Sequence, residues 1–303
     1  GTWGYIACAD GILYGTLADV GHIVKWSYQW GDMTELFSES KALFAFDVET
    51  GTQKWLHLAS DSIRHNTIAI GGGKVFLIDR PLADIDRLAK MKRRGIKAVT
   101  HPTGVLIALD AASGDVLWTL TENIFGTLLE YSEAHDALLM SHQPSRFQLS
   151  SEKTTLMAVY QGSNGDLIWE DADTLRYQNR PMINGNTIYA EPIAADLLTG
   201  EKLSFTFSRS YSCGTITGSP NLLLCRSATV GYRDLTVDDS ETENFGGCRP
   251  GCWINTIAVG GLVLMPDVTH GCTCSYLIRA SIALQEDKGA PEPPAGINGF
   301  ARF

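Results

Sequence analysis

The chain has 303 residues, of which 44% are hydrophobic and 19% are charged, which is an ordinary composition for a globular protein. Its net charge of −10 argues against a nucleic-acid surface, because phosphate recognition needs clusters of Lys and Arg. No stretch approaches the roughly 18 apolar residues of a membrane helix, so no membrane span is predicted.

The first elements are short strands joined by tight turns. Residues 3–9 and 12–17 are predicted as two strands around Asp10 and Gly11. Residues 41–47 and 52–58 complete a four-stranded unit, with Thr50 and Gly51 at the last turn. Gly51 suits this turn because glycine adopts positive φ at little cost.

That last hairpin carries a pattern that returns along the chain. Ala45-Phe-Asp47-Val-Glu-Thr50-Gly51-Thr-Gln-Lys-Trp55 is repeated at 108–118, again with one extra residue at 158–169, and a fourth time at 194–200, where Ser204 replaces Trp. The Asp can fix the turn through backbone N–H groups, and an indole can cover a neighbouring unit while its N–H finds a carbonyl. The pattern predicts a structural role for Asp47, Gly51, Trp55, Asp110, Gly114, Trp118, Gly165, Trp169, Asp196 and Gly200.

These four copies resemble the tryptophan-docking motif of PQQ-like repeats, a superfamily that includes quinoprotein alcohol dehydrogenases and BamB-like outer-membrane assembly scaffolds. The resemblance implies an all-β protein: a single β-propeller domain over residues 1–303, built of four-stranded blades. Six blades are predicted, at about 3–58, 64–120, 126–170, 180–207, 213–237 and 252–285.

The size of the complete ring has two readings. Proteins of this kind usually close with eight blades, and the chain starts at Gly1 without Met. Both points favour a fragment of a longer chain with blades before Gly1, and a closed ring of six or seven blades is the alternative. Two insertions interrupt the repeat at 22–40 and 80–103, the second read as a short helical insertion, and both are predicted partner surfaces.

The last third of the chain holds six of the seven cysteines. Clustered cysteines in a β-rich chain favour an oxidising compartment, so a periplasmic or otherwise extracytoplasmic location is predicted. Cys252, Cys272 and Cys274 are the disulfide candidates, although strands A and C of one blade lie about 9–10 Å apart and their loops would have to bend inward. A metal site that adds Cys248 is the less favoured alternative.

The same region carries a second resemblance. The segments 244–255, 260–266 and 271–276, together with Arg180-Pro181 and 210–214, are similar to a bacterial group of PQQ-like repeat proteins that are often large and multidomain. The similarity covers nearly all of residues 3–285. It implies that the propeller serves as a scaffold or ligand-recognition part of a larger protein.

Candidate binding residues lie near the predicted starts of the inner strands, where propellers usually bind ligands. They are Arg64, His65, Asn66, Arg180 and Arg249, with Arg209 and Asn255 as further candidates. Guanidinium groups bind carboxylates, including those of PQQ, and His65 is the best candidate acid or base. For any one of these residues, a structural role in capping loops is favoured.

Three functions compete. A non-catalytic propeller that binds a protein partner or a small ligand leads. A quinoprotein oxidoreductase using PQQ and Ca²⁺ is second, although its Ca²⁺ ligands, its catalytic Asp and its adjacent Cys pair match no position here. The third is a propeller module of a larger enzyme whose upstream domains hold the chemistry. No catalytic or metal-binding residue is predicted.

Overall fold

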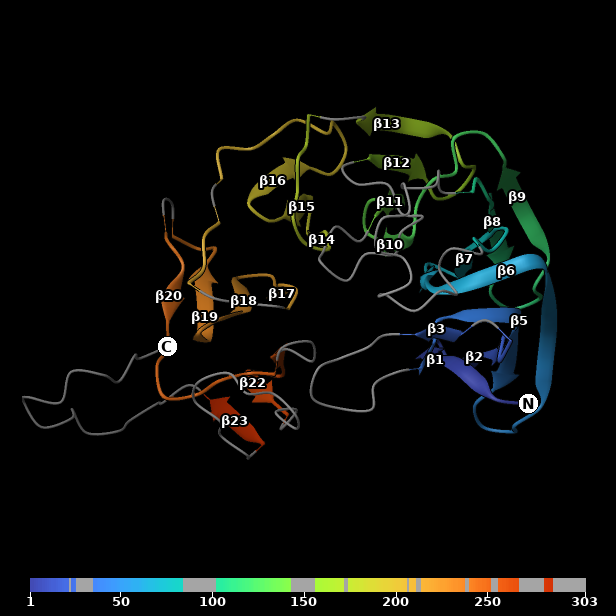
Figure 1. The fold of residues 1–303 in the computed structure, drawn as a ribbon, viewed down its shortest axis with the longest axis horizontal. Coiled ribbons are helices and arrows are strands. Elements are labelled where there is room, and N and C mark those ends of the chain that lie inside the picture. The colour runs from blue at the N-terminus through green and yellow to red at the C-terminus, as the bar shows by residue number, and fades with distance from the viewer. Residues whose placement is uncertain are drawn as a thin grey trace, which may run out of the picture. The chain divides into compact units, whose positions relative to one another are not determined.

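A computed structural model describes residues 1–21, 23–25, 35–83, 102–142, 156–171, 174–205, 207–210, 214–237, 240–251, 256–266 and 281–285. Every named element within these ranges is a β-strand, and none of these residues forms a helix that could cross a membrane (Figure 1). The chain divides into unit 1, Gly1–Arg176 with Ala195–Lys202, and unit 2, Tyr177–Ala194 with Leu203–Phe303. Each unit is described by itself.

Unit 1 begins with a seven-stranded antiparallel sheet in the order β1-β2-β5-β6-β7-β8-β9. Its strands are β1 (Trp3–Ala9), β2 (Ile12–Ala18), β5 (Glu39–Asp47), β6 (Gln53–Gly71), β7 (Lys74–Asp79), β8 (Val105–Asp110) and β9 (Val116–Leu120). A separate hairpin pairs β3 (Ile23–Lys25) with β4 (Glu35–Phe37). The second sheet of unit 1 contains β10 (Leu128–Ser132), β11 (Ala137–Ser141), β12 (Met157–Gln161) and β13 (Leu167–Asp171).

The long strand β6 belongs to two successive four-stranded groups (Figure 1). Its first half pairs with β5 and its second half with β7, and the pairing with β7 shifts register between Ile63 and Ile68. The strand predicted at 52–58 was expected to end before the second unit begins at 64, which is wrong: β6 runs through without a turn. The register shift lets one strand close the first group and open the second.

The core of unit 1 lies between successive groups. Tyr14, Leu43 and Trp55 from the first group pack with Leu77 and Leu109 from the second in one buried cluster. A second cluster joins β7 and β8 to the sheet of β10–β13. Alternate residues of β7 face opposite clusters, as the period of two in a strand requires.

Unit 2 is built of shorter strands in the same antiparallel style. A hairpin pairs β14 (Met182–Asn184) with β15 (Thr187–Ala190), and β16 (Ile193–Asp196) begins in this unit, while its last two residues belong to unit 1. A four-stranded sheet contains β17 (Thr217–Ser219), β18 (Leu222–Ser227), β19 (Thr229–Asp234) and β20 (Glu243–Asn244). The last sheet contains β21 (Ile257–Val259), β22 (Leu262–Met265) and β23 (Ile282–Gln285).

The all-β prediction is confirmed for the described residues. The predicted hairpin around Asp10-Gly11 is present, and similar hairpins turn at Asn184-Gly185 and Gly260-Gly261, with positive φ at each glycine. Most of the predicted helical insertion, residues 84–101, lies outside the described residues. The number of blades, the closure of the ring and the single domain over 1–303 stay predictions.

Candidate functional site

The strongest gathering of buried polar side chains in unit 1 lies where β6 passes from β5 to β7. There Glu39 on β5 pairs with Arg64 on β6, and Ile63 on β6 pairs with Asp79 at the end of β7. Arg80 directly follows β7. The strand pairing thus brings together residues far apart in the sequence, among them the predicted candidates Arg64 and His65.

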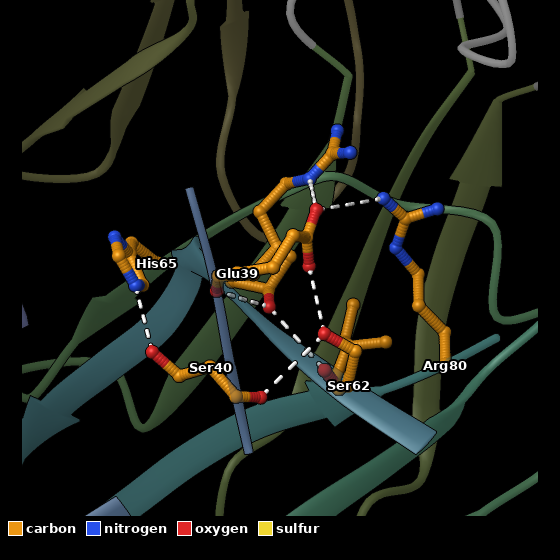
Figure 2. Close-up of polar contacts among 8 residues, drawn as sticks. Glu39, Ser40, Ser62, His65 and Arg80 are labelled. Carbon is orange, nitrogen blue, oxygen red and sulfur yellow. Dashed lines mark hydrogen bonds and ion pairs between the residues drawn. The ribbon is translucent and has the colours of Figure 1, made fainter. Parts of the chain in front are cut away.

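A buried carboxylate is the centre of this cluster. Glu39 is fully buried, and its Oε1 accepts a hydrogen bond from Arg64 Nε at 2.8 Å. Arg80 Nη2 lies 3.7 Å from the same oxygen, and Ser62 Oγ donates to Oε2 at 3.2 Å (Figure 2). Both arginines are at least 95% buried, with exposed fractions of 4% and 1%. A carboxylate and two guanidinium groups thus lie together away from water.

Asp79 fixes the backbone beneath this cluster. Its carboxylate accepts hydrogen bonds from the backbone N–H groups of Ser60, Asp61 and Ser62, at 2.6, 3.0 and 2.8 Å. Three such bonds hold the middle of β6 against the end of β7. The side chain of Ser62 is thereby aimed at Glu39.

A second, smaller network joins His65 to β5 and β2. His65 Nε2 and Ser40 Oγ are 2.8 Å apart (Figure 2). Ser40 Oγ in turn donates to Thr16 Oγ1 at 2.8 Å. Burial lowers the pKa of His65; the Glu39 carboxylate opposes this effect and Arg64 adds to it, and the net change is a lowering. The imidazole is therefore neutral at pH 7, as a base would have to be.

The Ser40–His65 pair is closed to substrates. Ser40 is fully buried, and a Cβ on Gly4 would lie 2.5 Å from the His65 ring and 3.1 Å from Ser40 Oγ. The backbone of β1 therefore covers the pair directly. The arrangement joins three strands, and it offers no space beside the hydroxyl for a reacting carbonyl.

The cluster was also compared with the needs of a PQQ carboxylate, which would have to reach a guanidinium group. Arg64 Nε already donates to the buried carboxylate of Glu39. Glu39 has no exposed surface and Arg64 is only 4% exposed, so a second carboxylate would have to enter a buried place beside an existing negative charge. These residues do not fit the cofactor. Asn66, the third candidate on β6, is exposed.

In unit 2, the further candidate Arg209 shows the same internal pairing. Arg209 Nε and Nη2 donate to the two carboxylate oxygens of Glu191 at 2.9 and 2.7 Å, and Nη2 also donates to Gly214 O at 2.7 Å. Arg249 is buried, and Arg180 is half-buried. The candidate Asn255 lies outside the described residues.

The described cysteines carry free thiols. Cys8 is exposed, Cys248 is half-buried and Cys225 is buried, and burial raises the pKa of the Cys225 thiol to about 12. The disulfide candidates Cys252, Cys272 and Cys274 lie outside the described residues. Within the described ranges no group of three or more His, Cys, Asp or Glu residues could hold a metal ion.

The repeated tryptophans each bond to the following copy of the pattern. Trp55 Nε1 donates to Ala111 O at 2.9 Å, Trp118 Nε1 to Gly162 O at 3.0 Å and Trp169 Nε1 to Leu197 O at 2.8 Å. Each acceptor lies three residues before the turn glycine of its copy. A Cβ on Gly114, Gly165 or Gly200 would lie 2.6, 3.0 or 2.8 Å from the ring of the same tryptophan. Glycine is thus required where the indole lies on the turn.

An open hollow lies in unit 2 between two hairpin turns. It has a volume of about 410 Å³, and its lining includes Pro220, Leu222, Val259, Leu262 and Leu284. Val259 is 54% exposed and Leu262 is 36% exposed. The hollow could receive an apolar side chain from outside.

The sequence did not predict the roles of the buried acid Glu39, the half-buried acid Glu191 and the buried arginine Arg80. A lone charge at the end of an apolar strand usually lies at the surface, so nothing in the pattern marks these residues as buried. The available signal was the excess of arginines near strand starts, since a buried arginine needs an acidic partner.

No family model matches the sequence, and no curated protein does. Among solved structures, BamB from Moraxella catarrhalis is 15% identical with a TM-score of 0.50, over 87% of this chain and 66% of that one. The computationally designed Ika8 protein is 11% identical with a TM-score of 0.51, over 88% and 68%. A quinohemoprotein alcohol dehydrogenase from Pseudomonas putida HK5 is 12% identical with a TM-score of 0.39, over 76% and 44%.

The first two similarities confirm the β-propeller fold that was predicted from the sequence. At these identities the similarity concerns the fold alone. The chain spans just under two thirds of the length of BamB.

Proposed function

We propose, from the propeller fold shared with BamB, that this chain is a non-catalytic binding module that recognises a protein partner. The observation that carries the proposal is the internal pairing of its candidate arginines. Arg64 is bonded to buried Glu39, and Arg209 is bonded through two nitrogens to Glu191. Side chains that a ligand-binding funnel would offer to a carboxylate instead stabilise the sheets.

The hollow of unit 2 supports a protein as the partner. Its rim exposes Val259 and Leu262, which flank the β21–β22 turn, with exposed fractions of 54% and 36%. Apolar side chains gathered around a concavity are typical of the centre of a protein interface, where an anchor side chain is buried. We therefore assign the partner contact to this hollow, with an apolar side chain of the partner seated in it.

The alternative of a quinoprotein oxidoreductase is tested by calorimetric titration of the protein with PQQ in the presence of Ca²⁺, together with a dye-reduction assay. We expect no saturable heat, no shift in melting temperature and no dye reduction. Micromolar saturable binding with dye reduction that Arg64→Gln abolishes would overturn the proposal. Saturable binding without dye reduction would replace a protein partner with a small ligand.

The partner contact is tested with a photoreactive amino acid at position 259, in an extract of the source organism. We expect one crosslinked protein, which is lost when Leu262→Asp is added. The matched control is Leu117→Asp on β9, which replaces a leucine that is 47% exposed in unit 1. Crosslinking that both substitutions leave unchanged would contradict the assignment of the hollow. The same extract, separated into compartments, tests the extracytoplasmic location.

A further inference from the structure

The first group of strands in unit 1 presents an apolar face to the outside. Residues directly opposite one another in a sheet share a face, and the register places Trp3, Leu17, Ala42 and Leu58 in one row and Ile6, Gly15, Phe44 and Leu56 in the next. Cys8, Leu13 and Phe46 form a third row. We call these three rows the outer face. The other side of the same strands packs into the core with β7 and β8.

The outer face is exposed where the matching face of the next group is buried. Ile6 is 64% exposed, Leu56 is 51% exposed and Leu58 is 68% exposed. On the next group, Leu77 and Leu109 are fully buried against the first group. A contiguous apolar face of this kind marks an interaction site. Trp3 and Phe44 already pack edge to face on it, with ring centroids 5.0 Å apart, so its surface is ordered.

We call the turn glycine and the carbonyl three residues before it, which together receive an indole, a tryptophan dock. The turn beside the outer face has this carbonyl and glycine, but no tryptophan of the described residues lies on it. In the later copies, the carbonyl three residues before the turn glycine accepts an indole N–H, as Ala111 does from Trp55. Val48 holds that position in the first copy and is 49% exposed, whereas Ala111 is 7% exposed. A Cβ on Gly51 would have nothing within 4 Å, whereas one on Gly114 would lie 2.6 Å from Trp55. Gly51 and Val48 thus repeat the geometry of an occupied dock.

We infer that the outer face is the docking surface for a further repeat unit of the same polypeptide. The last strand of that unit carries a tryptophan whose N–H donates to Val48 O and whose ring lies over Gly51. In all three observed docks the donor precedes its acceptor in the sequence, which places the new unit before residue 1. Its apolar side chains cover Ile6, Leu56 and Leu58.

Two observations favour this occupant over a second copy of the chain. The three docking tryptophans of a second copy already donate to carbonyls of their own copy. The chain also covers only 66% and 68% of the two solved structures whose fold it shares. A repeat unit supplies both features that the surface needs, which are an apolar sheet and a tryptophan at its last strand.

The test compares residues 1–303 with the polypeptide that the natural reading frame extends before residue 1. Cys8 lies on the outer face and is exposed, so maleimide labelling followed by peptide mass spectrometry reports coverage of that face. Buried Cys225 is the internal reference. We expect Cys8 to label at least about tenfold more slowly in the extended protein, because labelling then requires local opening.

A matched pair of variants connects that protection to the tryptophan dock. Gly51 and Gly73 both have positive φ, 67° and 69°, and both have open space around a Cβ. Asn tolerates such a φ, so Gly51→Asn and Gly73→Asn should fold alike in residues 1–303. In the extended protein, Gly51→Asn should restore fast labelling of Cys8, because its side chain fills the place of the indole, and Gly73→Asn should leave Cys8 protected.

Three results would overturn the inference. The first is a natural reading frame without a repeat unit before residue 1. The second is labelling of Cys8 at the same rate in both proteins. The third is protection of Cys8 in residues 1–303 alone, which would assign the face to another part of the chain, or to a second copy if the protection rises with protein concentration.

Discussion

Gly114 lies under the indole of Trp55, and Gly51 holds the same place in its own turn with nothing above it. Both have positive φ, 77° and 67°. Gly51→Ala should therefore cost only the backbone strain, about 1–2 kcal/mol. Gly114→Ala should cost an additional amount of about 1–3 kcal/mol, because its Cβ would lie 2.6 Å from Trp55.

Urea denaturation of the two variants beside the parent chain measures this difference. Equal losses of unfolding free energy would show that the indole does not press on the turn. The sequence predicted these glycines correctly as turn residues. It could not distinguish the covered turn from the open one, because the distinction depends on whether a neighbour is present.

Asp136 is the residue whose charge should matter most at low pH. Burial alone would raise the pKa of its carboxyl, but hydrogen bonds from Tyr131, Gln161 and Ser163, with Lys74 nearby, outweigh burial and lower the pKa from 3.8 to about 2. Since the folded pKa lies below the unfolded one, the stabilisation is present above about pH 4. It is lost as the pH falls from about 4 to 2.

The expected loss is on the order of 1–2 kcal/mol, reduced by the partial exposure of the carboxylate. Unfolding free energy measured from pH 5 to pH 2 in the parent chain and in Asp136→Asn checks this expectation. The difference between the two proteins should shrink as the acid is titrated. A difference that stays constant over this range would assign the effect of the substitution to lost hydrogen bonds rather than to charge.

Among elements, β6 has the largest structural role, because it belongs to two groups of strands and positions the Glu39 cluster between them. Replacing Glu39 by Gln keeps the shape but leaves Arg64 and Arg80 without its negative charge in a buried place. We expect Glu39→Gln to lower the unfolding free energy by about 3–5 kcal/mol, the usual effect of breaking a buried pair. The measurement is chemical denaturation at neutral pH.

Lys41→Met is the control from the same strand. Lys41 is 3.4 Å from Asp19, but its side chain is 62% exposed, so this surface pair should contribute less than about 1 kcal/mol. If Glu39→Gln cost no more than Lys41→Met, the Glu39 cluster would not stabilise the junction. If PQQ bound to the protein and changed its melting temperature, the Glu39 cluster would again be a candidate ligand site.

At the scale of elements, local hairpins could be predicted from the sequence, but the continuity of β6 could not. Hairpins with Asn-Gly or Asp-Gly turns were predictable, because the turn chemistry is local. The passage of one strand from β5 to β7 was not, because it depends on three backbone bonds to Asp79, a residue nearly 20 positions away. The buried Glu39–Arg64 pair was equally hidden, since only strand pairing brings its members together.

For the whole molecule, the propeller fold was predictable because the pattern returns four times along the chain and resembles the docking motif of a known repeat architecture. The copies do not tell which turns receive a tryptophan. Whether a turn receives a tryptophan depends on how many units stack, and the sequence of one copy does not contain that number. The same logic means that stability in unit 1 should be built from contacts between neighbouring groups.

This leads to a prediction about independent docks. Trp55→Phe and Trp169→Phe each remove one indole N–H and leave Ala111 O or Leu197 O without that donor, at a cost of about 1–3 kcal/mol each. The two docks share no residue, so the double variant should lose the sum of the single losses within about 0.5 kcal/mol. Trp3→Phe, at a tryptophan that is 49% exposed, should cost less than about 0.5 kcal/mol.

Trp55→Phe combined with Gly114→Ala provides the contrasting case. The Cβ added at Gly114 meets the ring at position 55, and a phenyl ring is smaller than an indole, so this double variant should lose less than the sum of its parts. Denaturation of all single and double variants under one set of conditions gives both coupling energies. A strong coupling between Trp55 and Trp169 would show that unit 1 responds as one inseparable body, and stacking of neighbours alone would no longer explain its stability.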